Sequence, residues 1–373
     1  VGYNIILNQD SIDAAKALGQ VIEPERLLSE SVLNGTILMI LVTCTVASFV
    51  AQKGAKNIAL SEASESDTED KDSLERILIP VSYIDTVEEL INLSVTIKSK
   101  KNKRGLYALN VISNSNVDSE AEKRARKVLD YAVVTASATD NHLEELLRYD
   151  VNIVNGISSV VKEHRISDVI LGLHNKTGIT KSFLGNLTEG ILTKCNTTTL
   201  IYKSSQPLAT IKRHIIIVPE NAEREIGFPF WLLKTWNIAR NAGATLVFYA
   251  NNTTLNYIKD VQIKHPIEAE FKEFSDWNDF LILSRDIKKD DNMIIVMSRK
   301  DYLSYNKNMS KIPTYLNNYF KDTNFILVYP MQAGVRDSSV INYSNPSVLE
   351  PIQGNLERLD DIGKTLASIF KKK

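Results

Sequence analysis

The chain has 373 residues, and its 44 lysines and arginines nearly balance its 45 aspartates and glutamates, which gives a formal net charge of -1 at pH 7. This balance, without a long basic face in the sequence, argues against nucleic-acid binding. The only two cysteines, Cys44 and Cys195, exclude a disulfide framework and indicate a reducing compartment.

The sequence opens with a short apolar segment that a polar connector follows. Residues 1–7 read VGYNIIL without an initiating methionine, so we expect the chain to be a fragment that begins at the end of an apolar helix. Residues 10–26 carry charges of both signs and are too polar to enter lipid. No signal peptide with a basic start and a small-residue cleavage site is visible, so we expect the soluble part not to be exported.

The run from Val32 to Ala51 contains no charged side chain over its twenty positions. At about 1.5 Å per residue, such a run spans roughly 30 Å as a helix, which is the hydrocarbon thickness of a bilayer. Small and weakly polar residues such as Gly35, Thr36 and Ser48 suit a helix that packs against other transmembrane helices. The alternative is a buried helix of a soluble core, but such helices seldom stay uncharged over this length. The run predicts a transmembrane helix at 32–51, the last of a membrane domain within residues 1–60.

The flanks of this run leave its orientation open, because Lys16 and Arg26 before it roughly balance Lys53 and Lys56 after it. Residues 61–73 (SEASESDTEDKDS) are acidic and rich in serine, so they cannot contribute to a core. They indicate a flexible linker. The residues after it read as soluble α/β protein.

Residues 74–205 alternate short apolar strands with helices. The first strand, at 76–81 (RILIPV), is apolar after its first residue, as expected for a strand buried on both faces of a parallel sheet. Strict alternation implies right-handed crossovers and a doubly wound parallel sheet. Further strands are expected at 106–112, 143–147, 168–172 and 199–202, and helices at 86–98, 119–136, 151–164 and 188–194.

Residues 210–332 repeat this order, with IIIVP matching ILIPV of the first pass and FILVYP matching TLIYK. The pattern predicts a tandem of Rossmann-like domains, 74–205 and a degenerate 210–332, with the boundary near 204–209. A tail at 333–373 ends in an amphipathic helix at about 356–370. Strands of the second pass are expected at 214–219, 245–249, 293–297 and 325–329, and a helix at 231–241.

The fifth strands of the two passes, 199–202 and 325–329, would each be an exposed apolar edge if they stood alone. We therefore expect them to face each other across a pseudo-twofold interface, so that one chain resembles a dimer of single domains.

In a doubly wound sheet, ligands bind at the carboxyl ends of the strands where the strand order reverses, here beside the first and fourth strands. The fourth strand leads into residues 172–186 (GLHNKTGITKSFLGN), after which a helix begins. Glycines there let backbone N–H groups approach phosphate oxygens, and the helix adds the positive end of its dipole. The candidate nucleotide-binding residues are Ser82, Gly172, His174, Asn175, Lys176, Gly178, Gly185 and Asn186.

This stretch resembles the universal stress protein family, whose nucleotide-binding members carry a glycine, two residues, a glycine, nine residues, a glycine and a serine or threonine after the fourth strand. Gly172 and Gly185 match the outer glycines and Gly178 a further common one, whereas Asn175 and Asn186 replace the middle glycine and the closing hydroxyl residue. Ser82 stands where the family commonly has an acidic residue. The resemblance implies ATP or another adenine nucleotide as a possible ligand of the first domain, and a remnant loop without a ligand is the alternative.

The second pass has no glycine between Gly243 and Gly334, so its loop 298–302 has no residue that lets phosphate approach closely, and we expect no nucleotide there. Its three tryptophans, Trp231, Trp236 and Trp277, are expected to be core or interface residues rather than a base-stacking platform. Five scattered histidines and the lack of HExxH, CxxC, GxSxG or Walker lysine motifs predict no catalytic residue, no metal site and no enzyme activity.

Residues 26–51 resemble the start and body of the last transmembrane helix of bacterial cation:proton antiporters of the sodium/proton exchanger type. The order of membrane helix, acidic linker and tandem stress-protein-like domains resembles the carboxyl end of such a transporter. The resemblance implies a cytosolic regulatory region for sodium/proton exchange, located at the inner (plasma) membrane with residues from about 55 onward in the cytoplasm. Its implied partners are the membrane domain, a nucleotide and a second copy in a homodimer.

Two other functions remain open. The first is a membrane-tethered, nucleotide-binding universal stress protein without a transport function. The second is an ATP-hydrolysing enzyme, which the lack of a base or a metal-binding carboxylate cluster near the glycine loop disfavours.

Overall fold

The computed structural model describes residues 13, 14, 16–19, 31, 32, 34–48, 75–114, 119–173, 185–332 and 361–371. These residues belong to two compact units, 1–71 and 72–373, and each is described by itself.

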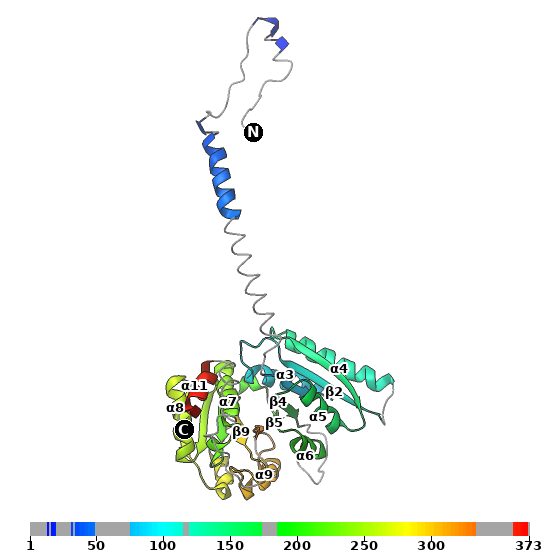
Figure 1. Cartoon of the computed structure of the whole chain (residues 1–373), viewed down its shortest axis with the longest axis vertical. Coiled ribbons are helices and arrows are strands. Elements are labelled where there is room, and N and C mark those ends of the chain that lie inside the picture. The colour runs from blue at the N-terminus through cyan, green and yellow to red at the C-terminus, as the bar shows by residue number, and fades with distance from the viewer. Residues whose placement is uncertain are drawn as a thin grey trace. The chain divides into compact units, whose positions relative to one another are not determined.

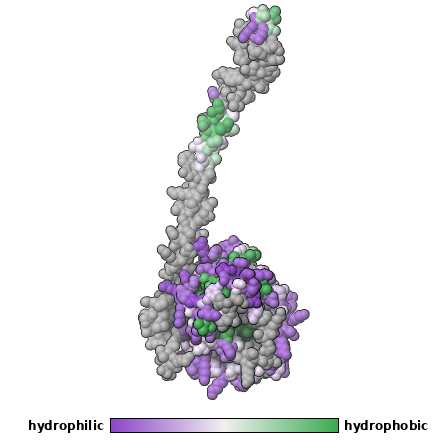
Figure 2. Space-filling view, turned by 90° about the vertical axis from the view of Figure 1, so that its right-hand side faces the viewer, coloured by the Kyte–Doolittle hydropathy of each residue, from purple (hydrophilic) through white to green (hydrophobic). Residues whose placement is uncertain are grey.

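In the first unit, residues 31, 32 and 34–48 are helical, and their apolar side chains are exposed (Figures 1 and 2). Ile37, Leu38 and Met39, for example, are 50%, 63% and 62% exposed. The hydroxyls of Thr36 and Thr43 donate to backbone carbonyls one turn earlier, both at 2.8 Å. These hydroxyls are therefore satisfied within the helix itself.

Among the described residues, no helix is both long enough and apolar enough to cross a membrane. Residues 33 and 49–51 of the expected span lie outside the described residues. The transmembrane helix predicted at 32–51 is thus not supported by the described part of the chain and stays a prediction.

The second unit is an α/β fold built on one ten-stranded sheet with the strand order β3-β2-β1-β4-β5-β10-β9-β6-β7-β8. All neighbouring strands are parallel except β5 and β10. The first half contains β1 (Ile77–Pro80), β2 (Leu106–Ser113), β3 (Leu143–Asp150), β4 (Asp168–Gly172) and β5 (Thr198–Lys203). The second half contains β6 (Arg213–Ile217), β7 (Thr245–Ala250), β8 (Ala269–Glu273), β9 (Asp291–Val296) and β10 (Asn324–Tyr329).

Helices cover both faces of the sheet, and each face has its own apolar core (Figure 1). One core includes side chains of α3 (Ile84–Ile97), α4 (Ser119–Ser137), α7 (Phe228–Ala242), α8 (Asn252–Lys264) and α11 (Asp361–Lys371). The other includes side chains of α5 (Ile153–Glu163), α6 (Gly185–Lys194), the 3-10 segment η4 (Trp277–Arg285) and α9 (Ile312–Tyr319).

The alternation expected from the sequence is confirmed in both halves, with three differences, of which the first is the additional helix α9 between β9 and β10. The third strand of the first half continues to Asp150, three residues beyond its expected end. In the second half, α8 and β8 occupy the middle that the sequence left unassigned, and η4 stands where the first half has α5. The described part of the terminal helix is 361–371.

The predicted pairing of the fifth strands is confirmed. β5 and β10 are antiparallel, with the register running from Lys203 opposite Phe325 to Thr199 opposite Tyr329. The central residues Ile201 and Leu327 are both 0% exposed. The two apolar edges therefore cover each other and join two five-stranded halves into one sheet.

We expect Leu200→Ala in β5 to destabilise both halves together, because Leu200 and Trp231 of the second half line the same small cavity between the halves. Loss of this buried side chain should lower the free energy of unfolding by about 2–5 kcal/mol. Urea unfolding should be followed by circular dichroism and by tryptophan fluorescence, since all three tryptophans (Trp231, Trp236 and Trp277) lie in the second half.

Both signals should move to the same lower midpoint, while Val134→Ala, at a position that is 66% exposed, should leave them unchanged. A fluorescence midpoint that Leu200→Ala does not move would contradict joint folding.

Candidate functional site

The described part of the predicted nucleotide site lies at the carboxyl ends of β1 and β4, which are neighbours in the sheet. Ser82 is exposed just beyond β1. The Nδ2 of buried Asn110 donates to the Val81 carbonyl at 2.8 Å, which fixes the chain where it leaves this strand. Gly172 is the exposed last residue of β4, and a Cβ there would come within 3.1 Å of the Leu90 side chain. The strand end is therefore shaped for a residue without a side chain.

The helix after this strand begins at Gly185, whose φ of 73° lies in the left-handed region that glycine adopts without strain. No heavy atom of the described residues lies within 4 Å of a Cβ placed there, and Asn186 beside it is exposed. Among the described residues, the start of α6 therefore offers backbone N–H groups that a ligand can approach. The other four candidate residues, His174, Asn175, Lys176 and Gly178, lie outside the described residues.

The same edge of the second half has a different character. β4 ends at Gly172, which pairs with Tyr202 of β5, and β9 ends at Val296, which pairs with Val328 of β10, so Gly172 and Val296 are the last residues of equivalent strands. Val296 is 1% exposed. A buried branched side chain thus replaces the exposed glycine.

A closed network of side chains occupies this edge of the second half. The buried Glu225 carboxylate accepts hydrogen bonds from the Ser304 backbone N–H at 2.9 Å and from the Ser304 hydroxyl at 2.5 Å. The Gln332 amide donates to Glu225 at 2.5 Å and to the Ser298 hydroxyl at 2.8 Å. These side chains satisfy one another, so the polar groups here are already used.

Arg299, in the loop after β9, connects this edge to the first half. Its guanidinium donates to the carbonyls of Leu192 at 3.3 Å and Thr197 at 3.2 Å, at the carboxyl end of α6, and also to the Pro330 carbonyl. Burial lowers the pKa of this guanidinium. The second half therefore holds the far end of the helix whose start belongs to the candidate phosphate site.

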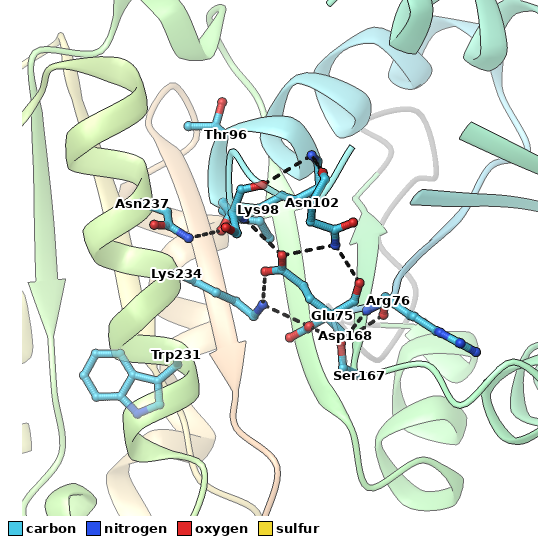
Figure 3. Close-up of polar contacts among 12 residues, drawn as sticks. Glu75, Arg76, Thr96, Lys98, Asn102, Ser167, Asp168, Trp231, Lys234 and Asn237 are labelled. Carbon is cyan, nitrogen blue, oxygen red and sulfur yellow. Dashed lines mark hydrogen bonds and ion pairs between the residues drawn. The ribbon is translucent and has the colours of Figure 1, made fainter. Parts of the chain in front are cut away.

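A buried ionic cluster crosses the boundary between the halves at the opposite, amino-terminal edge of the sheet (Figure 3). The ammonium of Lys234, on α7, lies 2.9 Å from the Asp168 carboxylate at the start of β4 and 3.3 Å from the Glu75 carboxylate. The three side chains are 9% exposed or less. Glu75 also accepts from the Ser99 backbone N–H at 3.0 Å, and Asp168 from the Ser167 hydroxyl at 2.6 Å.

This cluster contains the carboxylates of Glu75 and Asp168 and the ammonium of Lys234. The pKa values of Asp168 and Lys234 are both raised. Burial raises the pKa of the Asp168 carboxyl in spite of the nearby lysine. Burial alone would lower the pKa of Lys234, but the charges of Asp168 and Glu75 outweigh it and raise that pKa. Both directions fit a buried lysine that lies between two carboxylates.

The sequence pattern predicted neither the role of Arg299 nor this cluster. One signal was available: Lys234 is the single charge in FPFWLLKTWNIA, where a buried helix has no reason to carry an unpaired lysine. Nothing in the local sequence identified its partners, which lie 159 and 66 positions away. Among the described residues, no group of three or more histidine, cysteine, aspartate or glutamate side chains is placed to hold a metal ion.

We expect Asp168→Asn to change how stability depends on pH. The folded protein binds the Asp168 proton more tightly than the unfolded chain does. The stability that this proton contributes is therefore complete below the unfolded pKa of about 3.9, and it is lost as the pH rises through the raised folded pKa. The free energy of unfolding of Asp168→Asn, relative to the wild type, should therefore increase from about pH 4 to about pH 8. Urea unfolding across this range measures it.

Asp140→Asn is the matched control. The Asp140 carboxylate is exposed, and its hydrogen bond from Lys103 lowers its pKa. The difference in free energy of unfolding between Asp140→Asn and the wild type should therefore be constant above about pH 5. If the difference for Asp168→Asn is constant over the same range, the pKa of Asp168 is not raised in the folded protein and the prediction is wrong.

No protein-family model matches the chain, and no curated protein matches it. Among solved structures, a universal stress protein from Archaeoglobus fulgidus DSM 4304 is 14% identical, with a TM-score of 0.48 over 69% of this chain and 97% of that chain. The cytoplasmic domain of a prokaryotic cation chloride cotransporter is 11% identical, with a TM-score of 0.46 over 68% and 95%. The Archaeoglobus fulgidus universal stress protein in complex with dAMP is 15% identical, with a TM-score of 0.29 over 34% and 96%. At these identities and TM-scores, no function is transferred from these proteins to the chain.

Proposed function

We propose that the chain is the cytosolic regulatory region of a membrane cation:proton antiporter, in which the first half senses an adenine nucleotide and the second half transmits the bound state. The observation that carries this proposal is the difference between the two equivalent strand ends. One has an exposed glycine and a helix start with free space around it, and the other is closed by buried side chains.

This difference assigns unequal roles to two halves of the same topology. Phosphate binding needs backbone N–H groups that a ligand can approach closely, and Gly172 and Gly185 provide such an approach in the first half. In the second half, Val296 and the Glu225 network take up the corresponding volume. The second half is therefore a structural and transmitting element.

Two contacts connect the sensing site to the entry of the chain. Arg299 binds the far end of α6, so a ligand that reorients α6 acts on the second half. Lys234 of the second half binds Glu75, which is the first described residue after the acidic linker. A change in the relative placement of the halves therefore acts on Glu75, where the chain enters the α/β unit from the linker.

The apolar helix 34–48 supports attachment to a membrane. Its exposed leucine, isoleucine, valine and methionine side chains need a lipid or protein environment, because soluble proteins rarely expose apolar patches beyond a few hundred Å². A membrane-tethered, nucleotide-binding stress protein without transport is the alternative. The native coding sequence upstream of Val1 separates the two: several further hydrophobic spans support the antiporter, and a start codon close to Val1 contradicts it.

We expect the whole chain, held in detergent, to bind ATP or AMP in calorimetry and Gly185→Val to abolish the binding. The variant places a branched side chain where phosphate must approach the backbone.

Gly243→Val is the matched control, because Gly243 has a φ of 68° and equally free surroundings but lies in the second half. Both variants should lose similar stability from backbone strain, about 1–2 kcal/mol, while only Gly185→Val loses the heat of binding. No binding at millimolar nucleotide, or equal binding by both variants, would contradict the sensing role.

We also expect the chain to float with liposomes in a density gradient and the double variant Leu38→Asp with Leu41→Asp to stay at the bottom. Both leucines are more than half exposed, and each aspartate near the middle of an inserted helix costs about 2.5–3.5 kcal/mol. Val134→Asp with Val151→Asp, also at exposed apolar positions, should float like the wild type. A wild-type chain that does not float would refute membrane attachment.

A further inference from the structure

A cationic pocket lies between the two halves, at the amino-terminal edge of the sheet and away from the candidate nucleotide site. It forms where α3 and α7 end side by side and the first turn of α11 approaches them, and its volume is about 160 Å³. Its lining residues are Ser99, Lys100, Lys101, Asn237, Arg240, Asn241 and Asp361.

The pocket carries three positive charges and one negative charge. Within the part of the chain that the structure describes, no hydrogen bond or ion pair involves the side chains of Lys100 or Arg240. Lys101 acts electrostatically on Asp361, and together with Lys364 it lowers the pKa of that carboxyl, Lys364 having the larger effect. Two of the three cations are therefore available to a ligand, and the third faces a carboxylate that a ligand can replace.

Side-chain amides of α7 reduce the repulsion that an anion meets from the carbonyls at the end of α3. Helices α3 and α7 both end at this pocket, and free carbonyls at two helix ends would repel negative charge. The Nδ2 of Asn237 donates to the Ile97 carbonyl at 3.0 Å, and the Nδ2 of Asn241 donates to the Thr96 carbonyl at 2.8 Å. Figure 3 shows Asn237 extending from α7 toward the end of α3. The carbonyls at the end of α3 are thus already occupied.

We propose that this pocket is a second, separate anion site that binds the phosphate group of a ligand between Lys100, Lys101 and Arg240. Its volume is below the roughly 300–1,000 Å³ of pockets that enclose a whole small molecule. It therefore takes one or two phosphate groups, with the rest of the ligand in solvent. Guanidinium and ammonium groups bind phosphate through charge-assisted hydrogen bonds.

The position of the pocket makes it a regulatory site. Ser99, in its wall, donates its backbone N–H to Glu75, so a bound phosphate adjoins the buried ionic cluster and the entry of the chain. Asp361 begins α11, which packs on the second half through buried Ile362, Leu366 and Ala367. Phosphate and Asp361 compete for Lys101, which links ligand binding to the position of the terminal helix.

Calorimetry of the whole chain in detergent with pyrophosphate, at about 50 mM salt to limit screening, tests this proposal. We expect Arg240→Gln and Lys101→Gln each to weaken binding roughly tenfold or more, and Asp361→Asn to strengthen it severalfold because a repelling charge is removed. Lys212→Gln, at an exposed lysine paired with Asp290, is the matched control and should bind as the wild type does.

All these variants are compared in a Gly185→Val background, in which the proposed nucleotide site cannot contribute to pyrophosphate binding. In this background, absence of binding at millimolar pyrophosphate, or binding that Arg240→Gln and Lys101→Gln leave intact, would overturn the proposal. Phosphatidic acid added to the micelles distinguishes the source of the phosphate. Competition that requires Arg240 assigns the site to a lipid headgroup, and absence of competition assigns it to a soluble phosphate compound.

Discussion

The antiparallel pairing of β5 with β10 is the constraint on which the other contacts between the halves depend. Both strands are apolar at their centres and buried along nearly all of their length, and each would be the open edge of its own five-stranded sheet, where unpaired backbone groups invite association with other chains. Their pairing fixes the register between the halves. It also places α3 and α7 over the same face of the sheet, where they share one apolar core. The ionic cluster, the contact of Arg299 with α6 and the cationic pocket all require this arrangement.

The cluster of Lys234, Asp168 and Glu75 has a different energetic character from the strand pairing. Removing three charges from water costs several kcal/mol for each ion, and attraction offsets this cost only where hydrogen bonds satisfy the remaining polar atoms. Ser99, Asn102 and Ser167 provide such hydrogen bonds. We infer that the cluster contributes less to net stability than to a unique placement of α7 against the entry of the chain. A displaced α7 would leave two carboxylates buried without a cation.

The two halves show how one topology supports different roles. Their strands follow the same order, and Asp168 and Asp291 begin equivalent strands. At the last residue of these strands, Gly172 in one half and Val296 in the other decide whether the strand end is open or filled. A single side chain does not close the second site by itself. Glu225, Ser298, Ser304 and Gln332 come from separate loops and complete the closure through mutual hydrogen bonds.

The sequence by itself determined nine of the ten strands, the α/β alternation of the first half, the duplication and the pairing of β5 with β10. These features follow from local apolar patterns such as ILIPV and IIIVP, because a strand buried on both faces must be apolar throughout and an apolar edge must be covered. Only the tertiary structure decided which charges meet, that Arg299 reaches α6, that Gln332 closes the second strand end, and that Lys101 and Arg240 line one pocket. Such pairs lie tens to hundreds of positions apart. A charged side chain carries no local pattern that names its partner, so the path of the backbone through the fold alone brings the two together.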